Sequence, residues 1–284
     1  MIDMTTSLLN NSFLAEFIAI DVDRMESEDS LGTPAANRAV SDSLESGLLS
    51  IKQSNDGESD AVAMSIPVYK SGSIRSLAVF VGKADAIGVM EIWQPIGEHD
   101  ELNLTQGYFG PLERFQNVSS FVRFEKGSGL PGQVWREQTA VIHDNLPSHP
   151  GFLRAAGASA ESLQVAIGLP VASDDFLASA LLISADASPI ARGYEVWRCG
   201  DQHYELESAA YQRLDKTLTM DEGAVLTGEL SLPHLAVQTG VVCTSDDPAV
   251  VYCGRPYRED GVCKGMAIPF YEGDRVTSVL ALLL

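Results

Sequence analysis

The stretch Val165-Ala166-Ile167-Gly168-Leu169-Pro170-Val171 decides the fold of this chain, because it joins an apolar run to a proline. Proline at the first residue or the edge of a strand avoids the loss of a ladder hydrogen bond, so the stretch predicts one arm of a strand hairpin. The same apolar-proline step recurs at Ile66-Pro67 and Ile268-Pro269, with the prolines 103 and 99 residues apart. A period of about 100 residues is the length of one small domain, so the chain is predicted to contain tandem repeats.

Two further markers recur at the same period. The steps Leu31-Gly32-Thr33-Pro34, Leu130-Pro131 and Leu232-Pro233 each predict the start of a short helix, since proline in the first helical turn loses no needed hydrogen bond. Glu91-Ile92-Trp93 and Glu195-Val196-Trp197 predict equivalent strands, with the tryptophans 104 residues apart. Markers in one order at one period indicate copies of a single structural unit.

The middle copy gives the clearest local pattern. Strands are expected at 89–93, 102–108, 121–124 and 141–143, helices at 130–137 and 152–162, and a closing antiparallel hairpin at 165–171 and 178–185. The first copy shows no obvious pair of opening strands and predicts a helix over 11–25 instead. An antiparallel sheet with helices on one face belongs to the α+β class. We therefore expect a truncated or degenerate unit at 1–82 and complete units at 83–188 and 189–284.

Composition limits the classes of partner. The formal charge is −20 and the pI is near 4.5, and so acidic a surface repels phosphate backbones and anionic lipid headgroups. We expect neither nucleic acid nor membrane as a partner. No stretch approaches the ~20 apolar residues that span a bilayer, and the N-terminus does not resemble a signal peptide. The four cysteines form no C-x-x-C pair, which favours a reduced, cytoplasmic setting.

The middle copy resembles a GAF domain, a small sensory fold related to the PAS fold. The resemblance is carried by Gly129-Leu130-Pro131-Gly132-Gln133-Val134-Trp135, by Val141-Ile142-His143-Asp144 and by 166–171, all typical of bacterial members. The Glu-Ile-Trp start at 91–93 agrees with it. The third copy departs from the pattern, with His234 and Val237 in place of the second glycine and the tryptophan. The resemblance implies tandem GAF-like domains.

The resemblance leaves the phase of the repeat open. Units could begin at the helix, but we prefer units that begin at the Glu-x-Trp strand, because Leu284 stands where a GAF sheet completes its last strand. In that phase the long helices that usually flank GAF domains are missing after Ala185. The sheets are therefore expected to pack or pair with one another.

GAF domains typically hold a small ligand between the sheet and the helices and loops above one face. Carried over by position, the resemblance implies a ligand site at Phe124, Trp135, Asp144, Phe152, Arg154 and Ser162. Such pockets are mostly apolar with a few placed polar groups. Arg154, near Ser159 and Ser162 on an alanine-rich segment, would meet an anion. The alternative is that Phe124 and Trp135 are core and that Arg154 is solvated surface.

Histidine and cysteine bear on metal binding and on catalysis. His143 and His149 flank Asp144, but this spacing is unlike the tight spacing of metal ligands, and we expect no metal. Some GAF relatives reduce free methionine sulfoxide with loop cysteines. Cys253 and Cys263 lie in the corresponding region, where Arg255 and Arg258 would lower a thiolate pKa. The Gly-x-Gly-Val-Cys-Gly step of those enzymes has no counterpart at 230–235, so we expect a protein that is not an enzyme.

The sequence thus predicts a regulatory or sensory protein that binds a small molecule or a partner protein and signals through a separate output protein. It names no cofactor or ligand, and a homodimer fits the same pattern. The alternatives are a thiol-dependent reductase of the free methionine sulfoxide type and a scaffold that serves association alone. Fold analogy supports the ligand, and fold alone does not fix function.

Overall fold

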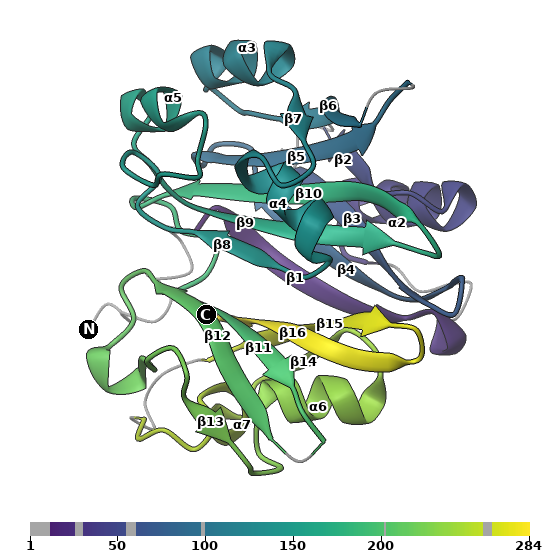
Figure 1. Ribbon diagram of the computed structural model, residues 1–284, viewed down its shortest axis with the longest axis vertical. Helices are drawn as coiled ribbons and strands as arrows, with labels where there is room; N and C mark the ends of the chain where they lie inside the picture. Colours follow the sequence, from purple (N-terminus) through teal and green to yellow (C-terminus); the bar gives the residue numbers. More distant parts are fainter. Residues whose placement is uncertain (1–11, 26–30, 55–60, 98–99, 202, 258–262) are drawn as a thin grey trace.

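Three antiparallel sheets follow one another along the chain (Figure 1). The computed structural model describes residues 12–25, 31–54, 61–97, 100–201, 203–257 and 263–284. The first sheet has the order β1-β4-β3-β2, the second β7-β6-β5-β10-β9-β8 and the third β13-β12-β11-β16-β15-β14. The strands that open each sheet, β1, β5 and β11, all pair with the last strand of their own sheet. The expected α+β class is confirmed.

The strand bounds show how the sheets correspond. The first sheet contains β1 (Leu14–Asp21), β2 (Ser50–Ser54), β3 (Ala61–Lys70) and β4 (Ser73–Lys83). The second contains β5 (Gly88–Pro95), β6 (Glu101–Tyr108), β7 (Phe124–Glu125), β8 (Val141–His143), β9 (Leu163–Ala172) and β10 (Phe176–Ala185). The third contains β11 (Gly193–Cys199), β12 (Tyr204–Tyr211), β13 (Val225–Leu226), β14 (Cys243–Ser245), β15 (Gly265–Glu272) and β16 (Arg275–Leu283). Within the described residues, the first sheet has no counterpart of the second and third strands of the other two.

One helix of each unit begins at a proline marker. These helices are α2 (Pro34–Ser46), α4 (Gly129–Glu137) and α6 (Leu232–Thr239). The side chains of Thr33 and Ser231 cap α2 and α6 by accepting backbone N–H groups, which explains why those helices start there. The other helices of the described residues are α3 (Glu113–Phe121), α5 (Ala155–Ala160), α7 (Pro248–Val251) and the 3-10 turns η1 (Val22–Arg24) and η2 (Lys216–Leu218). Within the described residues, no helix is long and apolar enough to cross a membrane.

The strand register confirms that the second and third units are copies. Trp93 pairs with Ser179, which pairs with Pro170 on the other side. Trp197 pairs with Val279, which pairs in turn with Pro269. The two tryptophans therefore occupy equivalent positions in their sheets, as the repeat of the Glu-x-Trp marker predicts.

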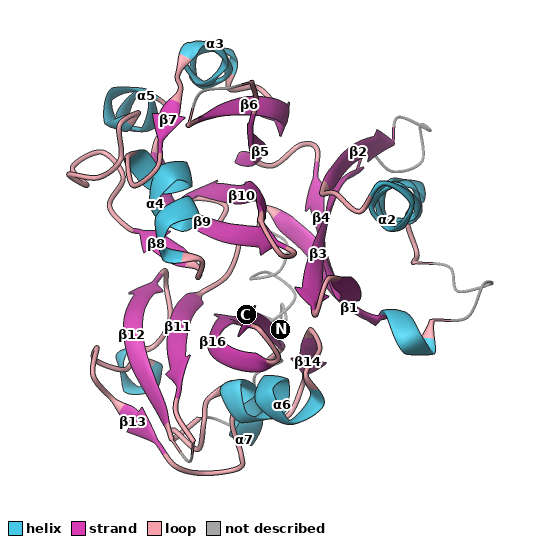
Figure 2. Cartoon of the chain, turned by 45° about the vertical axis from the view of Figure 1, so that its right-hand side comes forward, coloured by secondary structure: helices cyan, strands magenta, loops and turns pink. Residues whose placement is uncertain are grey.

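The three sheets pack against one another around a shared core (Figure 2). This core takes Met64 and Phe80 from the first sheet, Ile167 from the second and Ile268 and Leu280 from the third, all of them buried. The opposite face of each sheet carries the helices of its own unit over a separate apolar cluster. The expectation that the sheets pack on one another is confirmed, since each sheet covers faces of the others that would otherwise meet water.

Three hydrogen bonds link the units in a cycle around this core. The first unit meets the second where the Ile51 amide donates to Gln106 Oε1, at 3.0 Å. The second meets the third where Thr139 Oγ1 and Ser278 Oγ lie 2.6 Å apart. The third returns to the first where the Val242 amide donates to Ser76 Oγ, at 3.0 Å. Ser76 and Ser278 are equivalent in register, opposite Val68 and Phe270. The repeats therefore form a closed head-to-tail ring within one chain.

Two local expectations are wrong. The helix expected over 11–25 is strand β1 followed by η1, and residue 11 lies outside the described residues. Leu14, Phe17 and Ile20 imitate helical spacing because both faces of β1 are buried and its register shifts between Leu14 and Glu16. The strand expected at 121–124 is replaced by the end of α3 and by the two-residue strand β7.

Candidate functional site

A buried ion pair lies on the helix-covered face of the second sheet. Arg154, the residue before α5, donates from Nη1 to Glu91 Oε1 at 2.5 Å and from Nη2 to Glu91 Oε2 at 2.9 Å. Trp93 Nε1 donates to the same Oε2 at 2.9 Å, and Arg154 Nη1 also donates to Ser119 Oγ at 2.6 Å. The side chain of Arg154 is 1% exposed and that of Glu91 is 0% exposed. Both carboxylate oxygens are thus satisfied inside the protein.

Aromatic rings surround this guanidinium group. The Arg154 Cζ atom lies 4.6 Å from the ring centre of Phe115, 5.3 Å from Phe152, 5.4 Å from Trp93 and 5.9 Å from Phe124. All four rings are buried. Together with the arginine they fill the space between the second sheet and the segments above it.

The third sheet repeats the ion pair with a different geometry. Trp197 Nε1 donates to Glu195 Oε2 at 3.1 Å, as Trp93 does to Glu91. Arg255 reaches Glu195 with a single nitrogen, from Nη1 to Oε1 at 2.7 Å. Glu195 is fully buried and Arg255 is 9% exposed. The second and third units therefore share a charge pair that the marker tryptophan helps to hold.

Within the described residues, one nitrogen of the Arg255 guanidinium has no hydrogen-bond partner. Its Nη1 also donates to the Leu218 carbonyl at 2.6 Å, and its Nε donates to the Tyr252 carbonyl at 2.6 Å. The Tyr211 hydroxyl donates to Glu195 Oε1 at 2.9 Å, so this oxygen accepts from both Tyr211 and Arg255 Nη1. Arg255 Nη2 is buried and bonds no acceptor in the part of the chain that the structure describes. A buried donor left unpaired costs about 1–3 kcal/mol, so this nitrogen indicates a place for an acceptor.

The structure brings together three of the six residues expected at the ligand site. Phe124, Phe152 and Arg154 meet around the ion pair. Trp135 is half-buried elsewhere and stacks on Phe176 with ring centres 5.5 Å apart. Asp144 and Ser162 are exposed, as is Ser159. Arg154 is not solvated surface, because its charge is paired inside the core. Binding of a ligand at the six residues stays a prediction.

The two histidines of the middle copy stack on each other. The ring centres of His143 and His149 are 3.8 Å apart, and His143 Nε2 lies 2.9 Å from Gln133 Oε1. Burial, with the charge of His149 as a smaller cause, lowers the pKa of His143 from 6.5 to about 3. In the described residues, no group of three or more His, Cys, Asp or Glu side chains is placed to hold a metal ion.

The pKa values of the two loop cysteines are raised overall, although Arg255 lowers that of Cys253 as expected. Burial, with the charge of Glu195 as a smaller cause, raises the pKa of Cys253 to about 12 against the opposing effect of Arg255. Burial and the nearby Asp246 also raise the pKa of Cys263. Arg258 lies outside the described residues. Arg255 is engaged with Glu195, so it does not leave either thiol as a thiolate at neutral pH.

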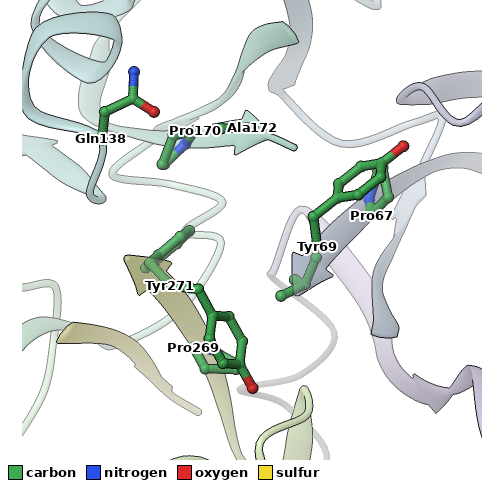
Figure 3. Close-up of a pocket in the computed structure, with 9 residues that line it drawn as sticks. Pro67, Tyr69, Gln138, Pro170, Ala172, Pro269 and Tyr271 are labelled. Carbon is green, nitrogen blue, oxygen red and sulfur yellow. The ribbon is translucent and has the colours of Figure 1, made fainter. Parts of the chain in front are cut away.

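The prolines of the three apolar-proline strand steps line one small hollow between the sheets (Figure 3). Pro67, Pro170 and Pro269 line it from three sides, with Tyr69 and Tyr271 at equivalent positions. Its volume is about 40 Å³. That is room for ordered water and far below the roughly 300 Å³ of a typical small-molecule pocket. The hollow lies where the three units of the closed ring meet, and it is too small to hold a small-molecule ligand.

Comparison with known proteins gives likeness in structure only. No family model matches the chain, and no curated protein matches it. Among solved structures it is similar to the nlh2 GAF domain of A. aeolicus in an inactive state, with 19% identity and a TM-score of 0.28 over 34% of this chain and 57% of that one. It is similar to a mutated nitrate-site NreA protein of Staphylococcus aureus, with 16% identity and a TM-score of 0.30 over 36% of this chain and 77% of that one.

Enzymes are also among these structures. The free methionine-R-sulfoxide reductase of Neisseria meningitidis matches with 20% identity and a TM-score of 0.28, over 36% of this chain and 53% of that one. A reductase of the same kind from Thermoplasma acidophilum matches with 17% identity. The expectation that the chain is not an enzyme is therefore corrected, because its structural neighbours include enzymes. The likeness itself assigns no activity to this chain.

Sequence reasoning missed the carboxylates of the site. Glu91 and Glu195 served only to mark strands, since a glutamate in a strand is ordinarily exposed. The available signal was a second repeat: Arg154 follows Glu91 by 63 residues, and Arg255 follows Glu195 by 60. A matched acid and base at nearly the same spacing in two copies would have predicted a buried pair in each.

Proposed function

We propose that this chain is a GAF-like regulatory protein that senses a small molecule in its third unit, at Arg255. The single observation that supports this is the buried Nη2 of Arg255, which bonds no acceptor in the described part of the chain. The equivalent Arg154 in the second unit has both terminal nitrogens engaged by Glu91. The third unit is therefore the better host for a ligand, and the second is already filled by its own side chains.

The chemistry of the site selects an acceptor. An arginine nitrogen binds carboxylate or oxyanion oxygens strongly, because the hydrogen bond is charge-assisted. The ligand that we propose is a small molecule with one such oxygen for Nη2. The nearby Glu195 carboxylate is held by Trp197 and Tyr211, so it stays in place when the ligand arrives. A small zwitterion meets this requirement through its carboxylate, and a neutral oxo compound through its oxo oxygen.

Hydrogen bonds connect the site to the segment between β12 and β13. Arg255 Nη1 holds the Leu218 carbonyl of η2, in the segment that connects β12 to β13. Tyr211 hydrogen-bonds both Glu195 and Met220, across the same segment. A ligand that draws Arg255 toward itself would shift this segment, and a separate output protein would recognise the change. Such coupling requires the ligand to bind the two arrangements with different affinity.

A thermal-shift screen of small carboxylates, oxyanions and oxo compounds tests the proposal. Ligand binding raises the melting temperature of wild type by mass action. The Arg255→Lys variant keeps a positive charge beside Glu195 and loses the unpaired nitrogen, so the stabilisation should vanish. Arg198→Lys, a change at an exposed arginine of the same sheet, is the matched control and should respond as wild type does. A screen without hits, or hits that stabilise Arg255→Lys equally, contradicts the site.

A further inference from the structure

In the second unit, the guanidinium of Arg154 contacts a carboxylate, a hydroxyl and four aromatic rings, all of which attract a cation. Both oxygens of Glu91 accept from it. Ser119 offers a lone pair, because its own proton is donated to the Phe115 carbonyl at 2.8 Å. The four rings around Cζ place negative π faces toward the guanidinium, and such cation–π contacts strengthen when water is excluded. A carboxylate with an aromatic box is a recognition site for an organic cation.

The two halves of this arrangement come from different parts of the unit. Glu91 and Trp93 lie on β5, paired within the sheet, and Phe115 and Ser119 lie on α3. Arg154 comes from the segment between β8 and β9, which runs above the sheet face. Its neighbour Leu153 is 58% exposed, so this segment lies at the protein surface. The carboxylate and rings form a receptor, and the arginine enters it from the covering segment.

We propose that the second unit contains a guanidinium-binding cage that its own Arg154 occupies in cis. The cage accepts an alkylguanidinium ion from solution when the arginine side chain is removed or withdrawn. Its selectivity comes from the planar fork, which matches the two oxygens of Glu91 with two parallel hydrogen bonds. The cage concerns the second unit alone and does not depend on the ligand proposed for Arg255.

Chemical rescue with methylguanidinium is the test. Arg154→Ala empties the cage and leaves Glu91 buried without its partner, so the full-length variant should melt well below wild type. Enclosed engineered cavities do admit ligands of matching shape. Methylguanidinium at millimolar concentration should raise the melting temperature of Arg154→Ala by about 3 °C when it exceeds its dissociation constant roughly tenfold.

Three controls show whether the rise in melting temperature comes from binding of methylguanidinium to Glu91 in the empty cage. Wild type should show none, because its cage is filled. The Glu91→Gln/Arg154→Ala double variant has the cavity without the carboxylate and should lose the rise. Methylurea, which has a similar planar shape and no charge, should leave Arg154→Ala unchanged. Stabilisation of the double variant by methylguanidinium as large as that of Arg154→Ala would contradict recognition by Glu91.

The proposal stays testable if Arg154→Ala does not fold by itself. Its refolding yield from urea should then rise with methylguanidinium and not with methylurea, and failure to recover folded protein with either counts against the cage. Arg154→Lys is the second variant: it retains the charge, loses the fork and should melt several degrees below wild type. A melting temperature equal to that of wild type would overturn the guanidinium selectivity.

Discussion

Arg154 and Glu91 are joined by two parallel hydrogen bonds, of 2.5 and 2.9 Å, although 63 residues separate them in the chain. The pair ties the segment before α5 to the sheet face at β5. Charges taken out of water need full compensation, and here Trp93 and Ser119 supply the remaining partners. The pair therefore stabilises one arrangement of the second unit.

Removal of either partner should be costly. Arg154→Met and Glu91→Gln should each reduce the free energy of unfolding by about 3–5 kcal/mol, because each leaves a buried polar group or charge without its partner. The double variant should cost clearly less than the sum of the single changes, since no charge is then stranded. Urea unfolding of the four proteins of the double-mutant cycle measures this coupling. Strictly additive losses would show that the two side chains do not act together.

The shared core should make the three units unfold together. Ile268 belongs to the third sheet but is buried among residues of all three. Ile268→Ala should reduce the free energy of unfolding by about 2–5 kcal/mol and lower amide protection in the first and second sheets as well. Val225→Ala, at a position that is 55% exposed, is the control and should stay within about 0.5 kcal/mol. Separate melting of the third unit, with the other two unaffected, would contradict a common core.

We expect the buried His143 to make the folded protein less stable in acid. Folding lowers the pKa of His143 from 6.5 to about 3, so the unfolded chain binds a proton more readily. The contribution of His143 to stability is complete above about pH 6.5 and is lost as the pH falls toward 3. His143→Gln should remove up to about 1.4 kcal/mol per pH unit from the slope of stability over this range. Parallel pH profiles of wild type and the variant would mean that His143 is not held neutral.

The thiols should react slowly in the native protein. Burial is the largest cause that raises the pKa values of Cys199, Cys243 and Cys253 to about 12. At pH 8 the thiolate fraction then falls roughly a thousandfold below that of an ordinary cysteine, and alkylation slows with it. Iodoacetamide labelling followed by peptide mass spectrometry, with and without urea, measures the ratio. Rapid native labelling of Cys253 would show that its loop opens and exposes the thiol.

The sequence predicted the repeat because proline and tryptophan have strong positional constraints. Pro67, Pro170 and Pro269 mark equivalent strand positions and meet at one hollow. Strand β1 could not be recognised, because both of its faces are buried and its register shift gives it a helix-like spacing. The closed ring was also beyond prediction, since contacts such as Val242 to Ser76 join residues with no local pattern in common.

The candidate site was only half predictable. The GAF resemblance placed Phe124, Phe152 and Arg154 near one another, and they do meet. It did not give their partner Glu91, because the two residues lie 63 positions apart and only comparison with Glu195 and Arg255 in the third copy indicates the pair. The difference between the units was also not predictable: Arg154 bonds both oxygens of Glu91, whereas Arg255 bonds only Oε1 of Glu195, an oxygen that it shares with Tyr211.

Native mass spectrometry with the most stabilising compound of the thermal-shift screen tests the ligand site at Arg255 most directly. Wild type, Arg154→Lys and Arg255→Lys are compared at equal protein and ligand concentrations. We predict a one-to-one adduct on wild type and on Arg154→Lys and its loss on Arg255→Lys, since only that change removes the unpaired nitrogen. An adduct that persists on Arg255→Lys, or that disappears only on Arg154→Lys, would contradict the assignment of the ligand to the third unit.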